Sequence, residues 1–172
     1  MTTNIEKYGL SIGSKAPSFT TVDTEKNEVS LETLLKNFRG VLINFFRGSW
    51  WAYCKKELKV LIEKRPEIER LNVMLISIAA DSTRNLRKLH ERYQSSFPFI
   101  ADKGGQIATM YNVYFTTDHP DTEHTHDEFQ DKHAIPSKYL INKDGIIVWR
   151  YIGTKEDRPV MGTMIDAIEK NL

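Results

Sequence analysis

Apolar runs of strand length alternate with segments of helical periodicity along the first half of the chain. Val41–Phe46 and Val73–Ala79 are near-continuous apolar runs, which are typical of strands covered on both faces. Between them, the segment from Cys54 to Pro66 carries its apolar residues at helical spacing. A strand, a helix and a second strand in this order predict a parallel sheet with a right-handed crossover.

Antiparallel patterns stand at the two ends of the chain. Residues 16–22 and 28–30 flank a polar turn and predict a small hairpin, and residues 139–142 and 146–151 flank Lys-Asp-Gly and predict a second one. Further elements are expected as helices over 31–36, 82–93 (capped by Ser82 or Asp81), 106–111 and 160–172, and as a strand over 97–100. The fold class is therefore α/β, three-layered, with an N-terminal hairpin extension and a central mixed sheet flanked by helices.

Length and composition favour a single domain over residues 1–172, because 40% of the residues are hydrophobic and 27% are charged. The net charge of +1 predicts neither nucleic acid nor an anionic membrane as a partner. No apolar stretch exceeds strand length, so we expect a soluble protein. A lone cysteine cannot form an internal disulfide, which fits the cytoplasm. No cofactor is expected.

Cys54 is that single cysteine, and the pattern places it where a strand turns into a helix. Backbone N–H groups in the first turn of a helix have no intrahelical partner and carry the positive end of the helix dipole. A thiolate there is stabilised, so the pKa of the thiol falls and the sulfur becomes a nucleophile near neutral pH. A lone cysteine is more often a small buried hydrophobe. The strand, turn and helix context favours the reactive thiol.

Four segments, in the same order, resemble the alkyl hydroperoxide reductase/thiol-specific antioxidant family of peroxiredoxin-like proteins. Phe45–Leu58 is similar to F-[FY]-R-G-x-W-C-P-Y-C-x-x-[EQ]-L, Phe97–Asp102 to F-P-x-L-x-D, and Ala134–Gly145 to v-P-x-x-F-x-I-D-x-D-G, while Asp157–Pro159 precedes the last helix. The resemblance implies a thioredoxin fold over nearly the whole chain and thiol-based redox chemistry.

The departures from the family pattern lie at positions whose residues take part in the reaction in the family. Trp51 stands where the family has a second cysteine or the threonine of the peroxiredoxin loop, and Arg47 stands where that loop begins with proline. Pro136 replaces an arginine of the peroxiredoxins and matches the cis-proline of thioredoxins. The resemblance therefore implies a cis Ile135–Pro136 bond facing the cysteine. Of the peroxidatic residues, Cys54 alone remains.

One cysteine is enough for peroxide reduction, in which the thiolate attacks a peroxide oxygen and becomes a sulfenic acid. A dithiol cycle within one subunit is excluded, so the reductant is an external thiol or a thioredoxin-like protein. We assign the stabilising donors to backbone N–H groups around Tyr53 and Cys54 and to Arg47, with Arg158 as a second cation. Trp51, Tyr53 and Pro136 complete the expected pocket for hydrogen peroxide or an organic hydroperoxide.

Two alternatives use the same fold. In the first, Cys54 forms mixed disulfides, as in a redox sensor, without turning over peroxide. In the second, the protein is a non-enzymatic binding module whose cysteine is structural, with Trp51 filling the former active site. The sequence is also compatible with a homodimer.

Residues 116–133 hold four of the five histidines together with several acidic residues. His124 and His126 could place two imidazoles on one side of a strand, which is a metal-ligand spacing. Polar segments of this kind are usually solvated insertions, so we expect no metal and no part in the thiol chemistry. We also expect the run Lys55-Lys56-Glu57, and His90, to lie on exposed helix surfaces.

Overall fold

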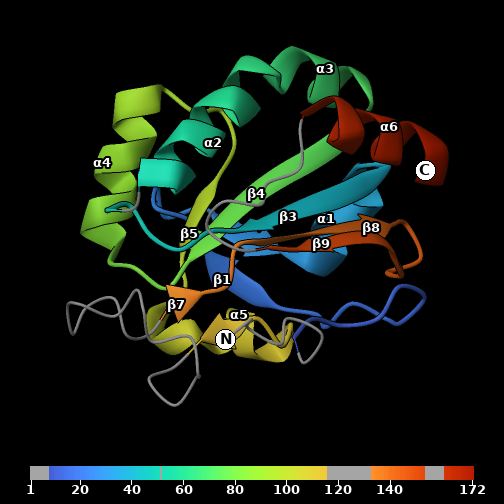
Figure 1. The fold of residues 1–172 in the computed structure, drawn as a ribbon, viewed down its shortest axis with the longest axis horizontal. Helices are drawn as coiled ribbons and strands as arrows, with labels where there is room; N and C mark the ends of the chain where they lie inside the picture. Colours follow the sequence, from blue (N-terminus) through green and yellow to red (C-terminus); the bar gives the residue numbers. More distant parts are fainter. Residues whose placement is uncertain (1–7, 51, 116–132, 154–160) are drawn as a thin grey trace.

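The computed structural model describes residues 8–50, 52–115, 133–153 and 161–172, with the backbone alone for 52–54 and 161–162. A five-stranded sheet in the order β5-β4-β3-β8-β9 forms its centre (Figure 1). Two smaller sheets pair β1 with β2 and β6 with β7. The strands are β1 (Thr20–Val22), β2 (Glu28–Ser30), β3 (Gly40–Phe45), β4 (Val73–Ala79), β5 (Phe99–Ala101), β6 (Tyr114–Phe115), β7 (His133–Ala134), β8 (Ser137–Asn142) and β9 (Ile147–Ile152).

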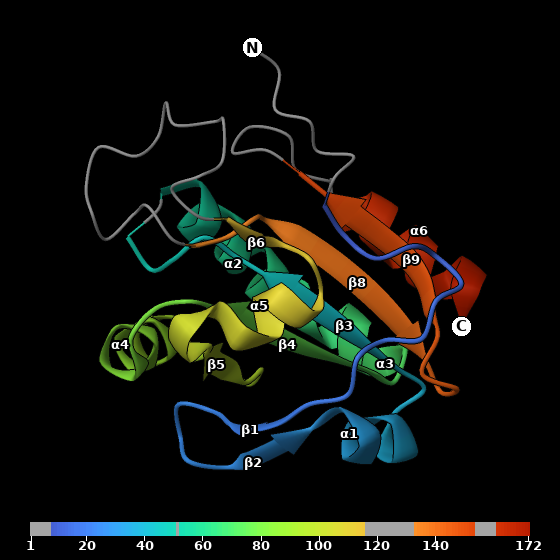
Figure 2. The same ribbon diagram turned by 90° about the horizontal axis from the view of Figure 1, so that it is seen from below.

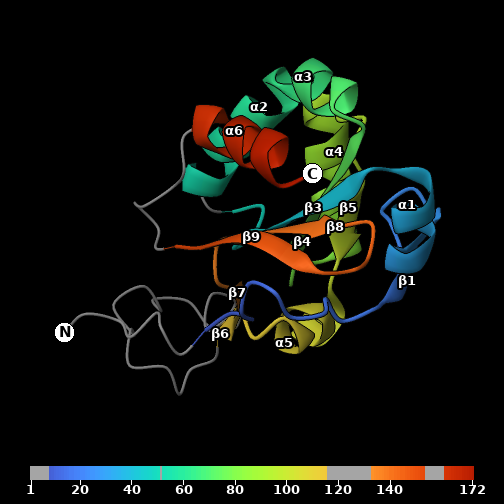
Figure 3. The ribbon, with the colours of Figure 1, turned by 90° about the vertical axis from the view of Figure 1, so that its right-hand side faces the viewer.

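The helices cover both faces of the central sheet. Figure 3 shows α2, α3, α4 and α6 above it, while α5 and the N-terminal segment lie below. The helices are α1 (Leu31–Asn37), α2 (Ala52–Glu63), α3 (Arg65–Arg70), α4 (Thr83–Tyr93), α5 (Gln106–Met110) and α6 (Met161–Asn171), with a 3-10 turn at Lys103–Gly105. This is the three-layer α/β arrangement expected from the sequence, so the predicted fold class is confirmed.

Strand β3 divides the apolar core into two layers. All six of its residues are buried, and alternation along the strand sends Ile43 to the layer below the sheet and Leu42 to the layer above. The upper layer contains Leu58 and Leu61 of α2, which belong to the helical stripe that the sequence predicts. Burial of each such side chain contributes about 1.5–3 kcal/mol. The apolar pattern alone therefore fixes which face of α2 meets the sheet.

Both predicted hairpins are present. The β1–β2 hairpin lies beside the main sheet, next to α1 (Figure 2), and Ser30 caps α1 by accepting a hydrogen bond from the backbone N–H of Thr33. In the β8–β9 hairpin, Asn142 pairs with Gly40 of β3, so the turn lies at the amino end of β3. The N-terminal extension is confirmed as an added hairpin.

Two details differ from the sequence expectation. Pro66 does not lead directly to a strand, since it occupies the first turn of the additional helix α3, where a missing backbone N–H breaks no helical hydrogen bond. The short β6–β7 pair is not predicted by the sequence, because its two-residue strands flank a long polar segment and carry no periodicity of their own.

Gly105 is expected to tolerate no side chain. Its φ is +66°, and a Cβ there would lie 2.0 Å from the ring of Tyr114, whereas neighbouring Gly104 has a φ of +69° and nothing within 4 Å. Gly105→Ala should therefore lower the free energy of unfolding by about 3 kcal/mol or more, against about 1 kcal/mol for Gly104→Ala. Chemical denaturation of both variants checks this. Equal losses would show that the Tyr114 ring moves aside.

Candidate functional site

Cys54 lies in the first turn of α2, at the carboxyl end of the central strands. Strand β3 ends at Phe45, and after the connecting loop α2 begins at Ala52, so Cys54 is the third residue of the helix. Its backbone position therefore agrees with the expected turn from strand to helix, next to the N–H groups that an α-helix leaves without intrahelical partners. The side chains of Tyr53 and Cys54, and the whole of Trp51 and Arg158, lie outside the described residues.

The loop before α2 is tied to the next strand by Asp81. One carboxylate oxygen of Asp81 accepts hydrogen bonds from the backbone N–H of Ser49 at 2.8 Å and from its hydroxyl at 2.6 Å. The other oxygen accepts from the backbone N–H of Ser82 and from the amide of Asn85, at the start of α4. Asp81 follows β4 in the chain, so a single side chain joins the loop before Cys54 to the cap of α4.

Burial raises the pKa of Asp81, but the hydrogen bonds from Ser49, Asn85 and Ser82 outweigh burial and leave the pKa below its ordinary value of 3.8. A depressed pKa in the folded state means that Asp81 stabilises the protein above pH 4, and that this contribution is lost as the pH falls through the folded-state pKa.

Asp81→Asn should cost about 1.5–3 kcal/mol of folding free energy at neutral pH, because an amide nitrogen cannot accept these hydrogen bonds. The variant should also lose the part of the acid-induced decline in stability that Asp81 causes. Urea denaturation at several pH values measures both effects, with the exposed Asp144→Asn as control. An unchanged acid profile would contradict the role given to Asp81.

A cationic and aromatic cluster lies on the other side of the same loop. Arg47 is 5% exposed, and its guanidinium lies 5.7 Å from the ring centre of Trp50. The indole of Trp50 meets His133 edge-on at 6.5 Å, and His133 stacks on Phe115 at 4.6 Å. The β6–β7 pair therefore contacts the loop that leads to Cys54. Trp50 is partly exposed.

His133 corrects one expectation. The sequence groups it with a solvated histidine-rich segment, yet it is buried at 4% exposure, in β7. The remaining residues of that segment, including His124 and His126, lie outside the described residues. Among the residues that the structure describes, no three histidine, cysteine or carboxylate side chains gather as a metal site. His90 is also less exposed than expected, because it packs edge-on against Phe99.

Glu57 and Lys138 form a buried ion pair that sequence reasoning missed. The ammonium of Lys138 donates a hydrogen bond to Oε1 of Glu57, and the two side chains are 0% and 12% exposed, respectively. The expectation that Glu57 belongs to an exposed helix surface is therefore wrong, because α2 turns this residue toward β8. A lysine inside an apolar strand, Ser137-Lys-Tyr-Leu-Ile-Asn142, was the signal that could have revealed it.

Pro136 lies at the end of the sheet where it was expected, but its peptide bond is trans and not cis. The register pairs Ser137 with Phe45, so buried Pro136 lies at the carboxyl end of β3, where the loop toward Cys54 begins. The expected cis Ile135–Pro136 bond is wrong, since no cis peptide bond occurs among the described residues. A trans bond is the more stable isomer by about 0.5–1 kcal/mol for a peptide bond before proline.

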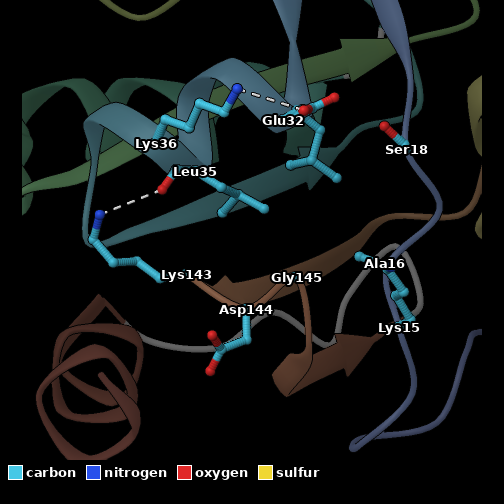
Figure 4. A pocket seen from close by; sticks show the side chains of 10 residues that line it. Lys15, Ala16, Ser18, Glu32, Leu35, Lys36, Lys143, Asp144 and Gly145 are labelled. Carbon is cyan, nitrogen blue, oxygen red and sulfur yellow. Dashed lines mark hydrogen bonds and ion pairs between the residues drawn. The ribbon is translucent and has the colours of Figure 1, made fainter.

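A cavity of about 460 Å³ lies at the opposite end of the sheet (Figure 4). Lys15, Lys36 and Lys143 stand around it, with Leu31 and Leu35 of α1 on one wall. Lys143 follows β8 at the amino end of β3, whereas α2 starts at the carboxyl end of β3. This cavity therefore adds nothing to the surroundings of Cys54.

Within the described ranges, no helix is long and apolar enough to cross a membrane.

Comparison with known proteins assigns the family. Residues 12–150 match the model of the AhpC/TSA family. The chain belongs to the AhpC/TSA family. Two curated relatives are thiol-disulfide oxidoreductases ResA. The protein of Bacillus cereus is 30% identical over 154 residues, covering 88% of this chain and 76% of the relative. That of Bacillus subtilis is 26% identical over 149 residues, covering 86% and 71%.

Solved structures of peroxiredoxins share the fold. The peroxidoxin BcpB of Mycobacterium tuberculosis superposes with a TM-score of 0.76 at 15% identity, covering 94% of this chain and 97% of that one. A cysteine-to-serine mutant of the peroxiredoxin 6 of Arenicola marina gives a TM-score of 0.80 at 15% identity, covering 94% and 73%. The resemblance inferred from the sequence motifs is confirmed. As a member of the AhpC/TSA family with ResA relatives, the protein is an oxidoreductase of the thiol type.

Proposed function

We propose that the protein is a one-cysteine peroxidase that reduces hydrogen peroxide or an organic hydroperoxide through Cys54. The observation that carries this proposal is the position of the only cysteine in the first turn of α2, at the carboxyl end of the central sheet. Backbone N–H groups there stabilise a thiolate. Because a single thiolate is sufficient for the attack on peroxide, no second cysteine is required for that step.

The reaction balances with an external thiol. The thiolate of Cys54 attacks the terminal peroxide oxygen, the O–O bond breaks, and the leaving alkoxide or hydroxide takes up a proton to form an alcohol or water. Cys54 is then a sulfenic acid. One external thiol condenses with it to a mixed disulfide and releases water, and a second external thiol attacks that disulfide and returns Cys54 to its reduced form. A small thiol or a thioredoxin-like protein supplies both electrons.

We infer that the first turn of α2 supplies the principal donors to the departing oxygen. Arg47 contributes a cation near the start of this helix, on the loop that Asp81 anchors. The burial of Arg47 beside Trp50 supports a fixed position for this charge. In this proposal Trp51, Tyr53, Pro136 and Arg158 keep their roles around the peroxide.

The ResA relatives favour a second candidate. Because they are thiol-disulfide oxidoreductases, Cys54 could act on a disulfide of a partner protein and release it only when a second, external thiol arrives. In that case mixed disulfides form without peroxide.

Rapid mixing of the reduced protein with hydrogen peroxide or cumene hydroperoxide, followed by trapping of the sulfenic acid, tests the proposal. We expect one sulfenic acid per chain, and repeated turnover when glutathione or reduced thioredoxin is present. Oxidation no faster than that of free cysteine, together with rapid mixed-disulfide formation from a model disulfide, would favour the second candidate.

A further inference from the structure

Two helices of this protein depart from the charge pattern that α1 and α3 follow. Helices α1 and α3 carry an acidic residue in the first turn and a basic residue in the last turn, which is the arrangement that the helix dipole favours. Helices α2 and α4 have no acidic residue in the first turn. The first charged residue is Lys55 in α2 and Arg84 in α4, so in both helices it has the sign that the dipole disfavours.

The same two helices place like charges one turn apart. Lys55 and Lys59 are four residues apart in α2, and residues at this spacing are neighbours on the surface of a helix. Arg84 and Lys88 have the same spacing in α4. In α1, the residues at this spacing have opposite charges and form an ion pair at 3.5 Å. Like charges at this spacing destabilise a helix, so stability of the fold gives no reason for these cations.

The starts of α2 and α4 lie at the same edge of the central sheet. Strands β3 and β4 are parallel neighbours, and α2 and α4 follow their carboxyl ends (Figure 1). Asp81 joins the two helix starts, because it accepts hydrogen bonds both from Ser49, in the loop before α2, and from Ser82, the cap of α4. The cations of the two helices therefore gather around the edge where Cys54 lies.

Five cations form this surface, which we call the basic helix-start surface: Lys55, Lys56, Lys59, Arg84 and Lys88. All are exposed except Lys55, which is half-buried, and none of the five forms an ion pair within the described part of the chain. Val60, beside Lys59, is 39% exposed. The net charge of the chain is only +1, so this concentration of positive charge is local.

We propose that the basic helix-start surface binds an acidic face of the partner protein that exchanges thiols with Cys54. This proposal rests on the proposed function, which requires an external thiol. Carboxylates of the partner would offset the like charges and meet the positive ends of two helix dipoles.

The extent of the surface favours a protein over a small thiol. Lys55 and Lys59 alone are about 6 Å apart along α2, and further cations stand on a second helix. A small thiol with one or two carboxylates pairs with only part of this set. A protein interface covers about 800 Å² on each partner, and exposed Val60 offers it an apolar contact.

The rate of mixed-disulfide formation with two probes tests the proposal. One probe is a single-thiol thioredoxin-like protein with an acidic face around its thiol, and the other is the same protein with those carboxylates changed to amides. Each is activated as a mixed disulfide with thionitrobenzoate. The thiolate of Cys54 attacks the probe's sulfur, a disulfide forms between the two proteins, and thionitrobenzoate leaves, so its absorbance gives the rate.

Wild-type protein should react with the acidic probe at least about tenfold faster than with the amide probe at low ionic strength. The ratio should fall to about two in roughly 0.5 M salt, because salt screens exposed charges. The combined variant Lys59→Glu/Arg84→Glu/Lys88→Glu should lose the preference for the acidic probe. If that variant does not fold, Lys88→Glu alone should still lower the ratio by about threefold.

Matched controls separate this surface from the net charge and from the thiol itself. Lys15→Glu/Lys36→Glu/Lys143→Glu changes the net charge equally, at exposed lysines around the far cavity, and should keep the preference. Iodoacetamide is uncharged and should alkylate Cys54 at the same rate, within about twofold, in every variant. Thermal melting confirms that each variant is folded.

Equal rates with both probes in the wild type, no reaction with either probe, or equal losses in the two triple variants would overturn the proposal. A loss of the same size with glutathione disulfide would assign the surface to a small anionic thiol and overturn the protein partner. The exchange requires no peroxide. A protein that shows the preference but does not turn over peroxide would therefore overturn only the peroxidase activity.

Discussion

Cys54→Ser is expected to abolish peroxide-dependent consumption of thiols, with a loss of at least about a thousandfold in the second-order rate. A serine hydroxyl is not ionised near neutral pH, and the chain has no other thiol to replace it. Consumption of hydrogen peroxide in the presence of glutathione or reduced thioredoxin measures the loss. Because serine is nearly isosteric with cysteine, the variant should retain the wild-type circular dichroism spectrum.

Asp144→Asn is the control for effects of mutation and purification that do not involve the thiol. Asp144 is exposed and lies at the end of the sheet opposite to the start of α2. It should keep the full rate. A Cys54→Ser protein that retained activity within tenfold of the wild type would contradict any mechanism based on this sulfur.

Trp51→Cys is expected to convert the protein into a dithiol oxidoreductase. The change creates a C-x-x-C spacing that ends at Cys54 in the first turn of α2, and this spacing across one helical turn lets two sulfurs meet. Mild oxidation should therefore remove both free thiols by forming an internal disulfide. Thioredoxin-dependent reduction of a model disulfide should become at least about tenfold faster, because the second thiol releases the mixed disulfide.

Trp51→Ala is the matched control, because it removes the indole without adding a thiol. It should form no internal disulfide and gain no exchange activity. Two free thiols that persist in oxidised Trp51→Cys would mean that the loop before α2 does not hold residues 51 and 54 at bonding distance. Because the ResA relatives are thiol-disulfide oxidoreductases, this variant tests whether one added cysteine is enough to change a one-cysteine peroxidase into a protein of that kind.

The order of strands and helices was available from the sequence because it depends on local periodicity. The apolar runs at Val41–Phe46 and Val73–Ala79 predicted β3 and β4 within one residue, and the cap of α4 is Ser82, one of the two residues that the sequence offered for it. A buried strand needs apolar residues on both faces, and a capped helix needs a side-chain acceptor at its start. These requirements act over a few neighbouring residues, so the amino-acid pattern records them directly.

The backbone position of Cys54 was available for the same reason, since it depends only on where a strand ends and a helix begins. The side chains that surround the start of α2 could not be predicted from the sequence. Asp81, Lys138 and His133 are 27, 84 and 79 residues from Cys54 in the chain, and no periodic pattern connects residues so far apart. Tertiary packing brings Asp81 to the loop before Cys54 and His133 to Trp50.

The sequence by itself thus determined the fold class, the family motifs and the place of the single thiol, because strand burial, helix capping and motif spacing are local properties. Only the tertiary structure decided that Glu57 turns inward to meet Lys138. A charged residue on a helix is normally solvated, and its burial depends on whether a counter-charge stands on the facing strand. Glu57 and Lys138 are far apart in the sequence, and they come into contact only after α2 has packed on β8.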